Sequence, residues 1–455
     1  MKMINKIISL KTAGRCGVPG YCNSKIKKFK ENDVSVVNLD LDVTSVTNNI
    51  ESEFSAEEVI AEPSVETLRN AIKDLEEPVL FRNLLRKCNG ENVWDILKWD
   101  METLSEKIGE KILPFRSGYK ARTTKPQWEV KNRVEWMTMK AFMNKKDSCN
   151  WYYFDYKYMH DWCKDCPEIL NSLSWNTFGF NLSGEDSTIW IGNEGAHTNC
   201  HQDSYGCNLV AQIHGQKEWI LFPPEATENL RPRRVPYEES TVYSSINLYS
   251  PSLEEENQIK NISGVRIVTL QPGEVLFIPK GWWHYVESLN LSVSINVWLP
   301  LETDCKARLE ESLVKLMINE IGTNIPTTSE TEKCSIFESI SFIRRSLEEC
   351  NKQKIKKVSA RSNDQAVWTT TTLTNAYSSF VFLVRHLNST ELQHCLSLKR
   401  NRFSTCIDNA NDYSIKQNEL GLSNQLLFEK IVNAFCNPEA IKKVADTLLN
   451  EDSFS

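Results

Sequence analysis

The stretch HTNCHQDSYGCNLVAQIHGQKEWILFPP, residues 197–224, combines strand-forming runs with chemically reactive side chains. Its second half contains two runs rich in β-branched, aliphatic and aromatic residues, CNLVAQIHG and KEWILFPP, joined by turn-forming residues. This pattern predicts a β-hairpin. In the first half, His201 and Asp203 are two residues apart. Side chains at i and i+2 of an extended chain project from the same face, so we expect these two to point at one spot.

Strand patterns continue on both sides of this stretch, between residues 187 and 300. Further β-branched and aromatic runs occur as STIWIG, RIVTLQPGEVLFIP and LSVSINVWLP, and turn-forming residues such as QPGE interrupt them. Several short strands with no helix between most of them are typical of an antiparallel barrel or sandwich. We therefore predict a core made mainly of β-strands.

Three parts of the chain differ in composition. Residues 1–61 are polar, with eight Lys or Arg and no Asp or Glu among the first thirty. We predict a disordered basic tail there, with an organellar transit segment as the alternative. Residues 62–300 combine helical patterns near their start with the strands described above. Residues 301–455 are predicted to be helical, up to a last helix that Pro438 begins, with a loose polar loop near 350–375.

The composition predicts a soluble protein of a reducing compartment, and we expect a cytoplasmic location. The net charge of −7 argues against the broad basic surface that binds nucleic acid nonspecifically. The apolar run FVFLV at 380–384 is far too short to span a membrane. The 14 cysteines have no regular spacing and no secretory signal precedes them, which favours reduced thiols. Cys163 and Cys166, in CKDC, lack the second pair that a structural zinc site needs.

A second segment, GEVLFIPKGWWHYVES, supplies His284 as a third candidate ligand. Two histidines and one carboxylate, arranged as His-x-Asp followed much later by His, are the ligands of the facial triad that binds Fe(II) and leaves positions open for cosubstrate and oxygen. The same ligands with a water molecule would suit zinc, and each residue alone also fits a structural role. Lys217 interrupts an apolar run. A buried lysine needs an anion, such as the far carboxylate of a metal-bound dicarboxylate.

Taken together, these segments resemble a known family. HTNCHQDSYGCNLVAQIHGQKEWILFPP, GEVLFIPKGWWHYVES and SVSINVW are similar to the JmjC domain of the cupin-type Fe(II)- and 2-oxoglutarate-dependent dioxygenases, in a hydroxylase-like branch that includes an asparaginyl hydroxylase. DYKY, STIWIG, RVPYEES and NPEAIKKVADTLL resemble family members associated with small heat-shock proteins. The resemblance covers residues 62–300 and returns at the extreme C-terminus. It implies an α+β fold with a double-stranded β-helix of the cupin or jelly-roll type, N-terminal helices and a helical C-terminal region.

The resemblance also implies roles for individual residues. The implied iron ligands are His201, Asp203 and His284. The residues implied to contact 2-oxoglutarate are Lys217, at its 5-carboxylate, and Thr198, Asn208, Asn296 and Tyr153. Tyr152 and Tyr156 are alternatives to Tyr153 as the tyrosine that contacts 2-oxoglutarate. One residue more than in the asparaginyl hydroxylase separates His201 from Asn208, and we expect a bulge in the strand to absorb it.

The implied activity couples oxidative decarboxylation of 2-oxoglutarate to hydroxylation of a C–H bond, with ascorbate as the reductant in an assay. We expect a protein hydroxylase, because the sequence shows no chromatin-reading Cys/His cluster. One alternative is a catalytically weak or inactive scaffold that binds a small heat-shock protein, and a second is a lysine demethylase. The expected partners are a protein substrate, with a small heat-shock protein as a candidate, and a second copy bound through the C-terminal helices. Neither nucleic acid nor a membrane is an expected partner.

Overall fold

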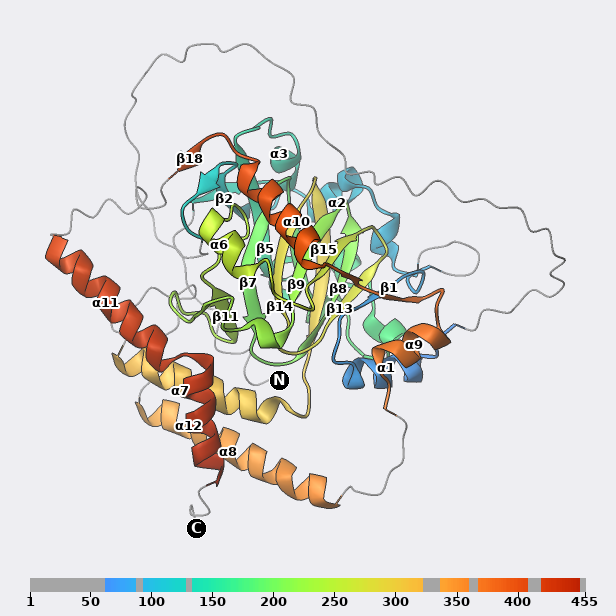
Figure 1. Ribbon diagram of the computed structural model, residues 1–455. Helices are drawn as coiled ribbons and strands as arrows, with labels where there is room; N and C mark the ends of the chain where they lie inside the picture. Colours follow the sequence, from blue (N-terminus) through green and yellow to red (C-terminus); the bar gives the residue numbers. More distant parts are fainter. Residues whose placement is uncertain are drawn as a thin grey trace. The chain divides into compact units, whose positions relative to one another are not determined.

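The computed structural model describes residues 62–86, 93–127, 133–321, 336–359, 367–407 and 419–450. They belong to one compact unit, Val59–Ser455. Two β-sheets lie at its centre and helices surround them (Figure 1). The tail predicted for residues 1–61 lies outside the described residues. Within the described ranges, no helix has both the length and the apolar character that crossing a bilayer requires.

Almost all strands belong to two antiparallel sheets, which confirms the predicted α+β fold with a mainly β core. The larger sheet has the order β16 (Val381–Leu383), β1 (Val79–Phe81), β13 (Val275–Ile278), β8 (Cys207–His214), β15 (Ser292–Leu299), β6 (Thr188–Gly192), β5 (Asn150–Tyr158), β2 (Leu113–Tyr119) and β4 (Arg133–Met137). The smaller sheet has the order β10 (Pro232–Arg233), β11 (Thr241–Ser244), β7 (His197–Asp203), β14 (Trp283–Ser288), β9 (Lys217–Phe222), β12 (Arg266–Leu270) and β17 (Arg385–His386). A separate parallel pair joins β3 (Arg122–Thr123) to β18 (Cys406–Ile407).

The hairpin predicted for the second half of residues 197–224 is wrong. β8 pairs with β13 and β15, whereas β9 pairs with β14 and β12, so these consecutive strands lie in different sheets. Gly215 in the connection has a φ of +62°, and a Cβ there would lie 2.1 Å from the carbonyl oxygen of Leu291. Only glycine allows this close approach. The crossing places Asn208 of β8 and Lys217 of β9 on opposite walls of one interior.

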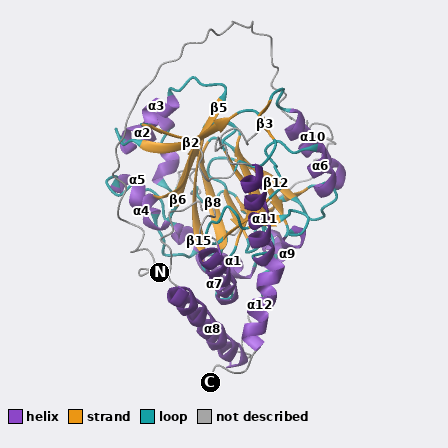
Figure 2. Ribbon diagram, turned by 90° about the vertical axis from the view of Figure 1, so that its left-hand side faces the viewer, coloured by secondary structure: helices purple, strands orange, loops and turns teal. Residues whose placement is uncertain are grey.

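Helices near the N-terminus cover the outer face of the larger sheet (Figure 2). Leu68 and Leu104 on these helices share one apolar core with Leu209 and Ile295 of the sheet. The cap residue Ser64 accepts a hydrogen bond from the Thr67 amide, which satisfies one free backbone donor of the first helix. These helices are α1 (Val65–Asp74), η1 (Asp95–Lys98), α2 (Met101–Ile108), α3 (Met139–Met143), α4 (Met159–Trp162), α5 (Pro167–Leu170), η2 (Trp175–Phe178) and η3 (Gly184–Asp186).

A different set of elements covers the outer face of the smaller sheet. α10 (Ser389–Asn401) packs Leu392 and Leu396 against Ile220 of β9 and Tyr285 of β14. α6 (Leu253–Ile259) lies beside α10, and the short helix η4 (Pro224–Ala226) follows β9. The strands of this sheet are thus fixed from outside by a segment that lies more than a hundred residues further along the chain.

The region after residue 300 is mostly helical. It contains α7 (Asp304–Ile321), α8 (Ile336–Ser359), α9 (Thr370–Ala376), α11 (Glu419–Phe435) and α12 (Pro438–Asn450). As the apolar periodicity predicts, Leu309 and Leu313 of α7 pack with Ile441 and Ala445 of α12.

The loop predicted near residues 350–375 is largely replaced by helix. α8 continues to Ser359 and α9 begins at Thr370, while 360–366 lie outside the described residues. The region also contributes β16 and β17 to the two sheets. Residue 300 therefore marks a change in secondary structure within one compact unit.

Candidate metal centre

Three of the predicted site residues meet on the inner face of the smaller sheet. β7 carries His201 and Asp203, and β14 carries His284 directly opposite His201. The ligand atoms of the three side chains all lie within 4.8 Å of one another, and the two imidazole centroids are 4.1 Å apart. Among the described residues, this is the one cluster of at least three His, Cys, Asp or Glu side chains with metal-binding spacing.

Neighbouring groups orient each ligand. The Nδ1 atoms of His201 and His284 lie 2.8 Å and 3.1 Å from backbone carbonyl oxygens. A carbonyl can only accept, so each Nδ1 carries the proton and each Nε2 keeps a free lone pair. Trp298 donates from its indole Nε1 to Asp203 Oδ2 at 2.9 Å, while Asp203 Oδ1 lies 3.8 Å from His201 Nε2. Burial, together with the adjacent His201, lowers the pKa of His284 to about 4, which keeps it in the neutral form that binds a metal.

Lys217 lies at the deep end of the same interior. Its side chain is 1% exposed. Its Nζ donates to Ser294 Oγ at 2.8 Å and to the Tyr153 hydroxyl at 3.4 Å, but it forms no ion pair with any described residue. Burial lowers the pKa of Lys217 to about 7, and the charge of Asp155 partly opposes this shift. A cation surrounded by hydroxyl groups and sealed from water fits the distant carboxylate of a dicarboxylic acid.

Thr198 reaches the same interior because of a β-bulge. His284 pairs with His201 and Val286 pairs with Thr198, so two residues of β7 lie opposite the single residue Tyr285. The extra residue reverses the side-chain alternation between Thr198 and His201. Both side chains therefore face inward, although a spacing of three in a regular strand would put them on opposite faces.

The two predicted asparagines lie on the opposing wall and contact each other. Asn296 donates from Nδ2 to Asn208 Oδ1 at 2.9 Å, and Trp190 donates to Asn296 Oδ1 at 2.8 Å. Asn208 pairs regularly with Trp298 and with Ile278, so no bulge occurs there. The segment 204–206 between His201 and Asn208 is a bend outside both strands, so the additional residue leaves the pairing of Asn208 regular.

The structure also distinguishes among the three competing tyrosines. Tyr153 contacts Lys217. Tyr152 donates its hydroxyl to Asp147 instead, at 2.7 Å. Tyr156 lies among other aromatic rings, 5.6 Å from the ring of Trp298.

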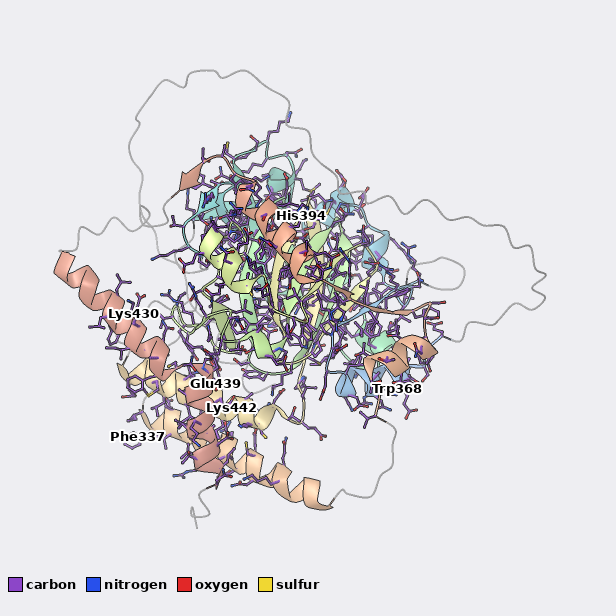
Figure 3. All side chains as sticks on the ribbon, viewed as in Figure 1. Phe337, Trp368, His394, Lys430, Glu439 and Lys442 are labelled. Carbon is purple, nitrogen blue, oxygen red and sulfur yellow. The ribbon has the colours of Figure 1, made fainter. Side chains whose placement is uncertain are left out.

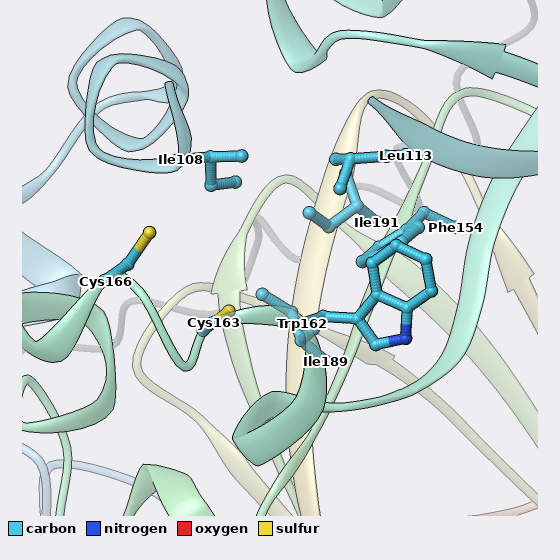
Figure 4. A pocket seen from close by; sticks show the side chains of 8 residues that line it. All are labelled: Ile108, Leu113, Phe154, Trp162, Cys163, Cys166, Ile189 and Ile191. Atoms are coloured by element: carbon cyan, nitrogen blue, oxygen red, sulfur yellow. The ribbon is translucent and has the colours of Figure 1, made fainter. Parts of the chain in front are cut away.

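Two other motifs lie away from the metal centre. His197 is buried and its ring stacks on Tyr249 at 4.0 Å, with Nδ1 against the Gly195 carbonyl. Cys163 and Cys166 line a small apolar cavity behind the larger sheet (Figure 4). The cavity encloses about 10 Å³, roughly the space that one water molecule needs.

Sequence reasoning missed several polar residues of the interior. Arg116 donates to Asp155 at 2.8 Å and to the carbonyl of His197 at 3.0 Å, which makes a buried ion pair beside the site. Ser294 is two residues before Asn296 in β15, so the alternation of the strand could have revealed it. The Arg116 pair gave no comparable signal, because its members come from β2 and β5.

Fold and site define the class of protein. Residues 65–304, more than half of the chain, match the model of the cupin-like domain, so the chain belongs to the cupin-like domain family. The resemblance to JmjC oxygenases is confirmed by the relatives.

Three individual relatives show which known proteins the chain is similar to. The chain is 39% identical to human (Homo sapiens) HSPB1-associated protein 1 over 274 residues, 57% of this chain and 55% of that protein. It is 38% identical to the HSPB1-associated protein 1 homolog of Danio rerio over 56% of this chain and 58% of the relative. Lysine-specific demethylase 8 of Xenopus tropicalis is 28% identical over 52% of this chain and 51% of that protein. The chain thus spans about half the length of the curated relatives it matches.

Proposed function

We propose that this protein is an Fe(II)- and 2-oxoglutarate-dependent dioxygenase that hydroxylates another protein. The observation that carries the proposal is the combination of three converging ligand atoms with a buried lysine that forms no ion pair among the described residues. Fe(II) with 2-oxoglutarate would supply oxidative decarboxylation coupled to the activation of dioxygen. A purely structural barrel needs neither feature, and an uncompensated buried cation lowers its stability.

Each inner residue has a role in this proposal. His201, Asp203 and His284 would hold the metal on one side and leave the opposite positions for cosubstrate and oxygen. Lys217 would bind the 5-carboxylate of 2-oxoglutarate, while its hydroxyl neighbour Ser294 orients the ammonium group.

Further inner residues complete the cosubstrate pocket in this proposal. Tyr153 and Thr198 would add hydroxyl donors near that carboxylate. Asn208 and Asn296 would line the pocket on the opposing wall, where their mutual hydrogen bond fixes both amides.

We propose a protein hydroxylase, with a lysine demethylase as the alternative. Two relatives are named for association with HSPB1. We therefore propose a small heat-shock protein as a partner or substrate, and a cytoplasmic location. A scaffold without turnover remains the rival, and activity distinguishes the two.

The test is conversion of 2-oxoglutarate to succinate by purified protein with Fe(II) and ascorbate, in the absence of added substrate. We expect slow succinate release from the wild type and from His160→Ala, a control at a half-exposed histidine away from the interior. His201→Ala and Lys217→Ala should release none. If neither the wild type nor the variants release succinate, and the wild type does not bind 2-oxoglutarate in the presence of metal, the scaffold alternative is supported instead.

We also propose that two copies associate through the C-terminal helices. α11 leaves Leu427 and Phe435 each 56% exposed, and α8 leaves Phe337 81% exposed (Figure 3). Both helices pack against α7, and large exposed apolar side chains on such a helical layer are typical of an interface. Association of two copies would bury them.

A further inference from the structure

The mouth of the metal centre carries four aromatic side chains to which the proposed function gives no role. The ring centroid of Tyr156 lies 5.5 Å from Tyr158, 5.7 Å from Trp190 and 5.6 Å from Trp298. We call these four residues the aromatic wall. One end of it is fixed to the metal centre, because the Trp298 indole donates to Asp203.

Tyr156 and Tyr158 form the solvent-exposed end of the aromatic wall. Lys217 pairs with Ser288, four residues along β14 from His284, which is roughly 13 Å deeper at about 3.3 Å per residue. Tyr153, which contacts Lys217, and Tyr156 are on the same strand, but Tyr156 is 37% exposed. The cosubstrate end therefore lies deeper than Tyr156, and Trp190 lies between them, with its ring centroid 6.0 Å from Tyr153 and 5.7 Å from Tyr156. A substrate that arrives from solvent meets the aromatic wall first.

A strained backbone holds Tyr156 in this position. Phe154 pairs with Ile191 and Lys157 pairs with Ile189, so Asp155 and Tyr156 form a bulge opposite the single residue between those partners. Tyr156 has a φ of +52°, a conformation that is unfavourable for residues other than glycine, especially bulky ones. Bulges next to active sites redirect side chains, and strain of this kind is maintained where a function requires it.

A carboxylate completes the rim. Tyr243 of β11 lies directly opposite His201 on β7, and the two rings are 6.2 Å apart. The Tyr243 hydroxyl donates to the half-buried carboxylate of Glu238. Aromatic faces and a carboxylate both attract cations and give a neutral side chain no comparable electrostatic attraction.

We propose that the aromatic wall and Glu238 bind a positively charged side chain of the protein substrate, an ammonium or a guanidinium group, and that Tyr156 is the residue that determines this specificity. The inference rests on the proposed function and specifies its substrate class. Tyr156 positions the target side chain by the face of its ring, and the bulge in β5 keeps that ring at the entrance.

The experiment uses pools of synthetic peptides with randomised flanks and one fixed central residue: arginine, lysine, phenylalanine or asparagine. Succinate formation is measured with the full chain, Fe(II) and saturating 2-oxoglutarate, and fluorescence anisotropy of labelled pools gives binding independently of turnover. We expect the arginine or lysine pool, or both, to bind and to stimulate turnover above the rate without peptide. The two cationic pools distinguish guanidinium from ammonium.

Variants test whether the aromatic wall causes the preference for cationic peptides. Tyr156→Gly removes the ring and relieves the strained φ, so the variant can fold while losing the contact. We expect it to raise the KM for the stimulating pool about tenfold, as the loss of a desolvated cation–π contact would, and to lower kcat less. Glu238→Gln should weaken cationic binding in the same direction. Asn83→Gly, which relieves a similar φ of +63° at an exposed site, should match the wild type.

The outcomes separate this inference from the proposed function. If the wild type neither binds 2-oxoglutarate nor forms succinate, the proposed function itself is wrong. If succinate forms but a neutral pool binds and stimulates as well as the cationic pools, or no pool does either, the aromatic wall does not select cations and the inference is wrong. An unchanged KM in Tyr156→Gly would also contradict it.

Discussion

At the scale of single residues, Lys217 is a side chain that selection for stability alone would not place in the interior. Its ammonium group is enclosed by the two sheets and, within the described part of the chain, donates hydrogen bonds to two hydroxyl groups and forms no ion pair. The cation is therefore poorly solvated until a carboxylate enters. Much of the affinity for a dicarboxylate should come from compensating this charge.

Lys217→Met should separate ligand binding from stability. Methionine fills a similar volume without charge, so we expect an equal or higher free energy of unfolding, because burying the cation disfavours the fold. Binding of 2-oxoglutarate should weaken at least about thirtyfold, as expected when a charge-assisted hydrogen-bonded pair worth roughly 2–5 kcal/mol is lost. Urea unfolding and calorimetric titration measure the two effects. A less stable variant with unchanged affinity would show that Lys217 has a structural role instead.

The affinity for 2-oxoglutarate should depend on pH above neutrality. The pKa of Lys217 is about 7 in the protein without ligand, and only the protonated form attracts a carboxylate. We expect a nearly constant affinity well below pH 7, a decrease of about half at pH 7 and a slope that approaches about tenfold per pH unit well above it. Lys217→Arg, if it still binds, should lack this slope, because arginine stays protonated. Calorimetric titrations between pH 7 and 9 measure it, and a flat profile for the wild type would contradict the assignment.

At the scale of elements, two strands and one distant helix hold the chemistry together. β7 and β14 supply all three candidate metal ligands. On the outer face of the sheet, Glu287 of β14 binds Lys399 of α10 at 2.9 Å and also Arg402. Lys399 also contacts Glu218 of β9, next to Lys217. The helix thus holds the strands that carry His284 and Lys217.

Glu287→Gln should loosen α10. The cations of Lys399 and Arg402 hold the pKa of Glu287 far below its usual value despite its burial. Its contribution to stability is thus present above the usual glutamate pKa and is lost as the pH falls below it. At neutral pH we expect a loss of about 3 kcal/mol in unfolding free energy, with faster hydrogen exchange in residues 389–401. Glu254→Gln, which removes an exposed ion pair with Arg231, should cost less than about 1 kcal/mol. Equal effects of the two variants would contradict this role of Glu287.

Metal binding should stabilise the folded protein by bridging side chains of β7 and β14. We expect added Mn(II), a redox-stable substitute for Fe(II), to raise the thermal unfolding temperature, because a ligand that binds only the folded state stabilises it by mass action. Asp203→Ala should abolish the shift, since it removes the carboxylate ligand. Asp95→Asn, at an exposed aspartate, is the control and should retain it. A shift that persists in Asp203→Ala would place the metal elsewhere.

At the scale of the whole molecule, segments after residue 300 pack against the two central sheets and add strands to them. β16 and β17 extend both sheets, while α7, α11 and α12 form a separate apolar core. Arg233 and Arg234, in the segment before β11, bind Glu429 of α11 and Glu311 of α7 at 3.0 Å and 2.6 Å. These contacts attach the C-terminal helices to the rim of the barrel.

The oligomeric state tests the exposed face of these helices. We expect sedimentation of the wild type as a dimer, and dissociation into monomers when Leu427→Glu and Phe435→Glu are combined, because two charges would then have to be buried in the interface. Val134→Glu and Trp136→Glu together change two exposed apolar residues on the edge strand β4 and serve as the control. A wild type that is monomeric at micromolar concentration would refute the dimer.

The sequence by itself determined the class of the fold and the three residues that the structure brings together as candidate metal ligands. Alternation in the strands, the turn residues and the His-x-Asp spacing of His201 and Asp203 are local features, so they can be read without knowing which strands are neighbours. His284 was found from its own segment and from the resemblance to a known family. The apolar faces of α7 and α12 could be predicted for the same reason.

Tertiary structure alone decided which strands pair and which side chains meet. The hairpin prediction was wrong because a two-residue connection through Gly215 is compatible with two arrangements. The chain can reverse within one sheet or cross to the other sheet, and the packing of both sheets decides between them. The bulges at Thr198 and Tyr156 change which side chains face inward, and a bulge depends on the partner strand. The lack of an ion pair at Lys217 among the described residues likewise depends on every element around it. Burial and charge compensation are properties of the assembled interior and not of the local sequence.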